Sequence, residues 1–136
     1  MPDESECVNY KGDKLSLIIP TYNERDNLPI LLERIHRTLS GIDYEIIIVD
    51  DNSPDGTWAV AEQLSHKFSN IKVIRRSRKM GLASAFLRCL NHAEGNLVGL
   101  MDADLQHPPE LLPKMLLEIL TKGNYSRVAE IPGSEV

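Results

Sequence analysis

Three features are scarce in this 136-residue chain, and each scarcity excludes a class of protein. The only two cysteines, Cys7 and Cys89, have no metal-binding spacing, which excludes a disulfide-rich scaffold and a zinc ribbon and indicates a reducing cytoplasm. Basic residues are fewer than acidic ones. The resulting net charge of −5 speaks against nucleic-acid binding, because that needs a basic surface. No apolar run is longer than a strand, so we expect no segment that spans a bilayer.

The beginning of the chain is polar and acidic. Residues 1–14 lack a basic region followed by an apolar core, so they do not have the pattern of a signal peptide. We expect residues 1–13 to form a flexible tail. The remaining length supports one domain with a real core over residues 14–122, followed by an irregular tail over residues 123–136.

Strand and helix patterns alternate along that domain. Apolar, β-branched runs predict four strands, at residues 15–19, 45–49, 71–74 and 96–101. Apolar residues at helical spacing predict helices between them, at residues 28–39, 55–68 and 82–92, and one more beginning at residues 108–110. The alternation indicates an α/β fold, with a mainly parallel sheet, right-handed crossovers and helices on both faces.

Each predicted strand is followed by a polar, turn-forming segment. The four segments are residues 20–24, 50–56, 75–81 and 102–106. The carboxyl ends of parallel strands meet at one rim of the sheet, where such sheets bind ligands, so all four segments should lie together. This coincidence is the strongest physical argument for a binding site.

The segment after the fourth strand has the spacing of a metal site. Alternate side chains of an extended segment point the same way, so Asp102, Asp104 and Gln106 can present oxygen atoms to one point. Hard oxygen donors at a strand end suit Mg²⁺ or Mn²⁺ bound together with substrate phosphates. A lone Asp-x-Asp is more often a solvated acidic turn, but the other three strand ends favour the metal site.

The segment after the first strand combines an aromatic ring with a carboxylate. Pro20 has no N–H to donate, so we expect it to end the strand, with Tyr22 and Glu24 emerging on one side. Tyr22 can stack on a nucleobase while Glu24 accepts from an N–H of that base. The alternative is an ordinary helix entry capped by Asn23 or Asp26.

The second and third strand ends are acidic and basic, respectively. We expect Asp51 to accept hydrogen bonds from a ribose or base, whereas Asp50 either does the same or caps the following turn. One or two residues of the basic segment should contact phosphate, and the others should form a solvated charge run. These basic residues are Arg75, Arg76, Arg78 and Lys79.

Taken in order, these segments resemble a known family. The residues that carry the resemblance are Pro20-Thr21-Tyr22-Asn23-Glu24, 49–57, 79–82 and 102–110. Over about residues 14–122 the chain is similar to the dolichol-phosphate mannose synthases, which are inverting glycosyltransferases of family 2. The resemblance implies a Rossmann-like nucleotide-diphosphosugar transferase fold and transfer of a hexose to a polyprenyl or dolichyl phosphate. GDP-mannose is the expected donor, and UDP-glucose is the alternative.

The resemblance also implies residue roles. The nucleotide would be held by residues at three strand ends, namely Pro20, Tyr22, Glu24, Val49 and Asp51, with Ala103 beside it. Mg²⁺ or Mn²⁺ would be held by Asp102, Asp104 and Gln106, and Asp104 is the implied catalytic residue. A phosphate monoester acceptor is already largely anionic at neutral pH, so such an enzyme needs no general base.

Members of that family continue well beyond the length of this chain. Residues 125–132 resemble a later strand of the family, so we expect the acceptor-binding middle to be missing. The expected partners are a nucleotide sugar, a polyprenyl phosphate, a membrane-anchored subunit and, through an uncovered sheet edge, a second copy of the chain. The expected location is the cytoplasm, including the cytoplasmic face of a membrane.

Two other classes of protein compete with this interpretation. One is a catalytically inert module that binds a nucleotide sugar. The other is a phospho-acceptor signalling domain, whose acidic pair normally follows the first strand. Here the first strand is followed by Pro20-Thr21-Tyr22-Asn23-Glu24, which makes the signalling domain the weakest of the three hypotheses.

Overall fold

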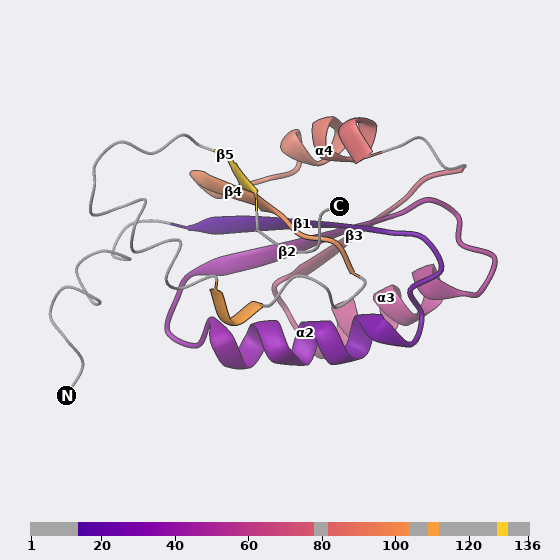
Figure 1. Cartoon of the computed structure of the whole chain (residues 1–136), viewed down its shortest axis with the longest axis horizontal. Coiled ribbons are helices and arrows are strands. Elements are labelled where there is room, and N and C mark those ends of the chain that lie inside the picture. The colour runs from indigo at the N-terminus through magenta and orange to yellow at the C-terminus, as the bar shows by residue number, and fades with distance from the viewer. Residues whose placement is uncertain (1–13, 78–81, 104–108, 112–127, 131–136) are drawn as a thin grey trace, which may run out of the picture.

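The computed structural model describes residues 14–77, 82–103, 109–111 and 128–130 as an α/β layer structure (Figure 1). A five-stranded sheet has the order β3-β2-β1-β4-β5, and every neighbouring pair is parallel. The elements are β1 (Leu15–Thr21), α2 (Asn27–Thr38), β2 (Tyr44–Asp50), α3 (Thr57–Lys67), β3 (Ile71–Arg75), α4 (Leu82–Leu90), β4 (Leu97–Leu100), η1 (Pro109–Leu111) and β5 (Val128–Glu130). The predicted fold class is therefore confirmed.

The predicted strands and the first three predicted helices are all present, with ends that differ by at most two residues. The fourth helix was expected to begin at residues 108–110; here Pro109–Leu111 form a short 3₁₀ turn, and the residues that follow lie outside the described part of the chain. Residues 128–130, within the segment expected to be irregular, form strand β5, with Val128 opposite Val98 of β4. None of the described helices is long and apolar enough to cross a bilayer.

Alternation along the strands divides the core between the two faces of the sheet. Helices α2 and α3 cover one face and α4 covers the other (Figure 1). Ile46 and Ile48 of β2 pack in the core with the buried leucines of α2, whereas Ile47 and Val49 pack with Ala85 and Cys89 of α4. The same alternation determines which face of the sheet is occupied by the side chains at the end of β2 and directly after it.

The thiol of Cys89 belongs to this packing. Cys89 is fully buried on the inner side of α4, and burial raises the pKa of its thiol to about 12. The thiol therefore stays protonated and acts as a small apolar side chain, because the thiolate is the reactive form of cysteine.

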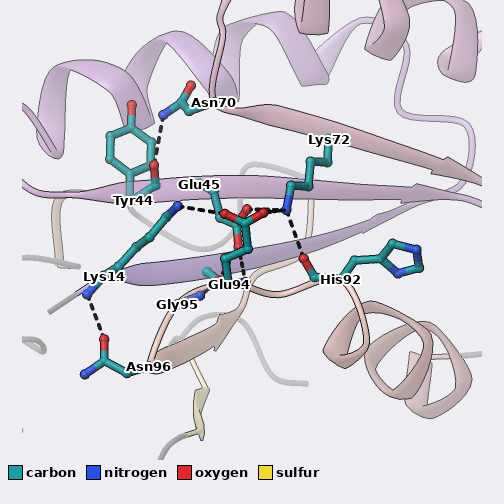
Figure 2. A network of polar contacts seen from close by, with 10 residues as sticks. Lys14, Tyr44, Glu45, Asn70, Lys72, His92, Glu94, Gly95 and Asn96 are labelled. Carbon is teal, nitrogen blue, oxygen red and sulfur yellow. Dashed lines mark hydrogen bonds and ion pairs between the residues drawn. The ribbon is translucent and has the colours of Figure 1, made fainter.

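The amino ends of the strands are joined by a polar network around Glu45 (Figure 2). The Glu45 carboxylate accepts from the Ser16 hydroxyl at 2.6 Å and from the Glu94 N–H at 2.7 Å, and it pairs with the Lys72 ammonium at 3.0 Å. Gly95 donates its N–H to Ser16 at 2.8 Å, and a Cβ there would lie 2.5 Å from the Lys14 carbonyl oxygen. The network thus holds β1, β2, β3 and the entry to β4 at the edge opposite the predicted site.

Glu45 should make folding stability depend on pH at the acid end. Burial raises its pKa, but the bonds from Ser16, Glu94 and Lys72 outweigh burial and leave the pKa below the usual value. A carboxylate with a lowered folded pKa stabilises fully above its unfolded pKa of about 4.3, and that contribution is lost as the pH falls through the folded value.

We predict that Glu45→Gln lowers the free energy of unfolding by about 2 kcal/mol at pH 7, because it removes charge-assisted hydrogen bonds from a buried site. The difference from wild type should shrink toward pH 3, where the wild-type carboxyl also becomes protonated. Urea unfolding at pH 7, 5 and 3 measures it. Glu33→Gln, on the exposed side of α2, is the control and should stay near wild type. An undiminished difference at pH 3 would contradict the assignment.

Candidate functional site

The predicted site lies where β1 and β4 stop pairing. Their ladder runs only from Leu15 to Ile18 in β1. Its last hydrogen bond is donated by the Met101 N–H to the Ile18 carbonyl at 3.0 Å. The chain runs from β1 to β2 and β3 on one side, and β4 lies on the other, so this is the point where the strand order reverses. Open α/β sheets bind ligands at this position, beyond the carboxyl ends of the strands.

Pro20 lies inside β1, opposite Val49, so the prediction that it ends the strand is wrong. The Thr21 carbonyl accepts from the Asp51 N–H, and the Ile18 carbonyl accepts from β4. Because successive residues of a strand bond to opposite neighbours, Pro20 turns its missing donor toward β4. No β4 residue pairs with β1 at that level, so proline is tolerated in an interior strand.

Asp50 joins the two strand ends. Its side chain is fully buried and accepts from the Thr21 hydroxyl at 2.8 Å, the Ser53 hydroxyl at 2.6 Å and the Ser53 N–H at 2.9 Å. Of the two roles left open by the sequence, these contacts favour the turn-capping one. Asp50 has the parity of Ile46 and Ile48 along β2, which directs it to the α2 and α3 side of the sheet.

The loop after β1 is attached to the loop after β2 by further bonds. The Asn23 N–H donates to the Ser53 hydroxyl at 2.9 Å, and the Glu24 N–H donates to the Thr57 hydroxyl at 3.0 Å. Asn23 adopts a positive φ of 58°, a conformation that asparagine tolerates better than most residues. These bonds fix the backbone on either side of Tyr22, whose side chain remains 39% exposed. Asp26 stands at the start of α2, but its side chain makes no capping hydrogen bond. The alternative of a helix entry capped by Asp26 is therefore not realised.

Asp55 holds the beginning of α3. It accepts from the Thr57 N–H at 3.0 Å and from the Arg25 N–H at 3.3 Å. Burial raises the pKa of Asp55, but the bonds from Thr57 and Arg25 outweigh it and leave the pKa below the usual value. The carboxylate therefore remains ionised at the positive end of the helix and links it to the loop after β1.

Asp51 forms a buried ion pair that the sequence analysis missed. The Arg76 guanidinium binds both carboxylate oxygens, with Nε 2.6 Å from Oδ1 and Nη2 2.9 Å from Oδ2. Asp51 and Arg76 are each only 8% exposed. Register could have indicated this pair: Asp50 lies opposite Arg75 at the last rung of the β2–β3 ladder, so Asp51 and Arg76 come next.

The expectation of a solvated basic run is wrong for Arg76, whereas Arg75, the other described arginine of the β3–α4 segment, is exposed. Arg76 is buried against Asp51 and donates through Nη1 to the Ser84 hydroxyl at 2.7 Å. The guanidinium carbon of Arg75 lies 3.8 Å from the centre of the Trp58 ring. Its Nη2 donates to the side-chain oxygen of Asn52 at 3.0 Å. Arg78 and Lys79 lie outside the described residues. The described arginines thus organise the rim of the sheet around protein groups.

The predicted metal segment is only partly described. Asp102 lies two residues after the end of β4 and is half-buried, while Asp104 and Gln106 lie outside the described residues. Ala103, expected beside the nucleotide, is 2% exposed and packs with Met101 in the core on the α2 side. Among the residues that the structure describes, no three histidine, cysteine or acidic side chains are grouped so as to hold a metal ion.

The remaining predicted nucleotide ligands differ in accessibility. Val49 is fully buried in the core against α4, and Pro20 is half-buried in β1. Glu24 is half-buried and accepts from the Asn27 side chain at 3.0 Å. The structure therefore brings the ends of β1, β2 and β4 to one rim, with Tyr22 the most exposed member of the predicted set.

A parallel sheet with acidic strand ends at its switch point defines an open α/β domain of the kind that binds ligands at this rim. Comparison with known proteins narrows this class. The chain belongs to glycosyl transferase family 2, whose pattern matches residues 16–134.

Named relatives agree with that membership. The dolichol-phosphate mannosyltransferase of Pyrococcus furiosus is 53% identical over 111 residues, which cover 82% of this chain and 31% of that protein. The corresponding protein of Saccharomyces cerevisiae is 41% identical over 103 residues, covering 74% of this chain and 39% of that protein. The chain thus spans about a third of the length of these curated relatives.

A solved structure supports the fold. The mannosyltransferase PcManGT from Pyrobaculum calidifontis, in complex with GDP-Man and Mn²⁺, has a TM-score of 0.69 and 24% identity. The match covers 80% of this chain and 33% of that one.

We predict that Asp50→Ala lowers the free energy of unfolding by about 3 kcal/mol, because it removes the acceptor of the buried Ser53 donors and leaves the Thr21 hydroxyl with only its longer contact to the Val49 carbonyl, at 3.3 Å. Urea unfolding at pH 7 measures the loss. The control is Asp26→Ala, since Asp26 is exposed and makes no capping bond; it should change stability by less than about 0.5 kcal/mol. Equal effects of the two substitutions would refute the role of Asp50.

Proposed function

We propose that the chain is the nucleotide-sugar-binding part of a metal-dependent inverting glycosyltransferase that transfers mannose from GDP-mannose to a polyprenyl or dolichyl phosphate. The 53% identity to the Pyrococcus dolichol-phosphate mannosyltransferase carries this proposal. It extends over 82% of the chain, which is enough to include most of the strand ends described above. A UDP-glucose-dependent enzyme with the same kind of acceptor is the alternative within this class.

The donor would lie across the ends of β1, β2 and β4. Tyr22 would stack on the base, and Glu24 and Asp51 would accept hydrogen bonds from the nucleoside. Pro20, Val49 and Ala103 would shape the site around the nucleotide. The bonds from Asn23 and Glu24 to the β2 loop support this proposal, because a pre-ordered loop loses little entropy when the nucleotide binds.

A divalent cation fits the donor set of the segment after β4. Asp102, Asp104 and Gln106 offer only hard oxygen atoms, the type that Mg²⁺ and Mn²⁺ prefer. The bound metal would offset the negative charge that develops on the departing nucleoside diphosphate. Asp104 is the proposed catalytic residue, through its contact with the metal and the diphosphate. PcManGT, which has a similar fold, forms a complex with GDP-Man and Mn²⁺, and this supports the proposal of a divalent cation.

The acceptor would be its own nucleophile. A phosphate monoester has a second pKa near 6, so most of it is doubly ionised at neutral pH. The proposed enzyme therefore needs to position the acceptor oxygen rather than remove a proton from it. A membrane-anchored partner subunit, and a location at the cytoplasmic face of the membrane, would bring the soluble donor and the lipid acceptor together.

A catalytically inert nucleotide-sugar-binding module is the second candidate. The described residues carry side chains of the proposed donor site, whereas transfer also needs the acceptor to be positioned. The edge strands of the described sheet, β3 and β5, also offer unpaired backbone groups to a second copy of the chain.

We predict that GDP binds more tightly with Mn²⁺ than without it and that Asp102→Asn removes this enhancement. Losing a charged ligand should weaken GDP–Mn²⁺ binding by about tenfold or more, and Gln106→Ala should weaken it less, because it removes a neutral donor. Isothermal titration of GDP and UDP, with and without Mn²⁺, measures the effect. Asp43→Asn, at the opposite edge of the sheet, is the matched control and should bind as wild type does. Unchanged binding by the Asp102→Asn, Asp104→Asn double variant would rule out the metal assignment.

We further predict that the chain by itself binds the donor nucleotide but transfers mannose to a short polyprenyl phosphate slowly or not at all. A discontinuous assay with purified chain, Mn²⁺ and radiolabelled GDP-mannose measures product formation. The Pyrococcus relative serves as the positive control. Robust turnover by the monomeric chain would exclude the inert module, whereas absence of nucleotide binding would reject both candidates.

A further inference from the structure

The contact between Arg76 and Asp51 places a buried cation beside a carboxylate that is proposed to bind the nucleoside. Arg76 follows β3 and Asp51 follows β2, so the guanidinium approaches the carboxylate from the β3 side of the sheet. The loop that carries Tyr22 follows β1, on the other side of β2. Asp51 therefore stands between Arg76 and the region proposed for the base.

The geometry of the pair fixes the orientation of the carboxylate as well as its charge. Nε and Nη2 of Arg76 bind separate oxygens of Asp51 at 2.6 and 2.9 Å, the two-point arrangement that a planar guanidinium makes with a carboxylate. Each carboxylate oxygen has two acceptor positions, and the guanidinium takes one on each. A ligand N–H that binds Asp51 would therefore have to approach in the plane that Arg76 imposes.

Arg76 is itself held on a second side. Its Nη1 donates to the Ser84 hydroxyl in α4 at 2.7 Å, and its backbone N–H donates to the Asp50 carbonyl at 2.8 Å. Asp51 shares the parity of Ile47 and Val49, which face α4, so the side chain points toward the helix that carries Ser84. With three side-chain nitrogens on protein groups and 8% exposure, Arg76 is built to hold Asp51 rather than to meet a solvent-borne phosphate.

We infer that Arg76 is a positioning residue for nucleoside recognition: it orients the Asp51 carboxylate toward the N–H edge of the donor base, with Ser84 as its support. This inference rests on the proposed function, in which Asp51 binds the nucleoside. It adds Ser84, which the sequence did not single out, and it gives Arg76 a role other than the phosphate contact for which the sequence made it a candidate. The interaction acts through Asp51 and contributes to the base-dependent part of the affinity only.

The decisive variant is Arg76→Lys, which keeps the positive charge but cannot bind both oxygens. We expect it to weaken GDP and UDP binding by about tenfold in the presence of Mn²⁺, the effect of losing one charge-assisted hydrogen bond. Inorganic pyrophosphate with Mn²⁺ should bind as it does to wild type, because it has no base. Ser84→Ala, which is milder for folding, should weaken the two nucleotides by about threefold in the same pattern.

Two controls separate positioning from other roles. Arg88→Lys changes an exposed arginine that lines the same cavity of about 310 Å³ as Arg76 and Ser84, and it should leave all three affinities unchanged. In an Asp51→Asn background, Arg76→Lys should alter the GDP affinity by less than about twofold, since the residue through which it acts is already changed. Thermal unfolding confirms that each variant is folded before titration.

The outcomes distinguish the inference from the proposed function. If wild type binds neither nucleotide, the proposed function fails. If wild type binds nucleotides and Arg76→Lys binds them equally well, the inference is overturned while the function stands. Equal weakening of GDP, UDP and pyrophosphate, or an undiminished effect of Arg76→Lys in the Asp51→Asn background, would also overturn it. Selective loss of nucleotide affinity that disappears without Asp51 supports it.

Discussion

A single buried carboxylate, that of Asp50, couples the ends of the two central strands. It has no exposure and accepts three hydrogen bonds, from Thr21 at the end of β1 and from the backbone and hydroxyl of Ser53 in the β2 loop. A buried carboxylate without such donors would carry a large desolvation cost, so folding favours the arrangement that brings the two loops together. The Ser53 hydroxyl in turn accepts a hydrogen bond from the Asn23 N–H, and this bond fixes the backbone next to Tyr22.

The neighbouring aspartate has a different task because strand geometry turns it the other way. Asp50 belongs to the side of the sheet that packs on α2 and α3, and Asp51 belongs to the side of α4. One carboxylate therefore holds the loops, while the other meets Arg76 at the rim. The two adjacent acidic residues therefore face opposite sides of the sheet, with Asp50 joining the two loops and Asp51 pairing with Arg76.

The two edges of the sheet are organised by different polar groups. At the amino edge, Glu45 connects Ser16, Lys72 and Glu94, far from the proposed donor site. At the carboxyl edge, the ladder between β1 and β4 stops early and Pro20 turns its missing donor toward the opening. Both edges thus carry buried polar contacts, but only at the carboxyl edge does the pairing of β1 with β4 end before the end of β1.

Sequence by itself determined the order of strands and helices, the parallel sheet and the gathering of polar segments at its carboxyl edge. These follow from local periodicity and from the rule that parallel strands end on one side. It also indicated the family, through motifs that are short and ordered along the chain. Only the tertiary structure decided between the two roles of Asp50, placed Pro20 inside β1 and paired Asp51 with Arg76. Those outcomes depend on register and on which face a side chain occupies, and both involve contacts between segments that are 25 to 30 residues apart, such as Asp50 with Thr21 and Asp51 with Arg76. A local sequence pattern does not show such contacts, because a charged residue after a strand looks the same in the sequence whether its side chain is solvated or buried against a partner.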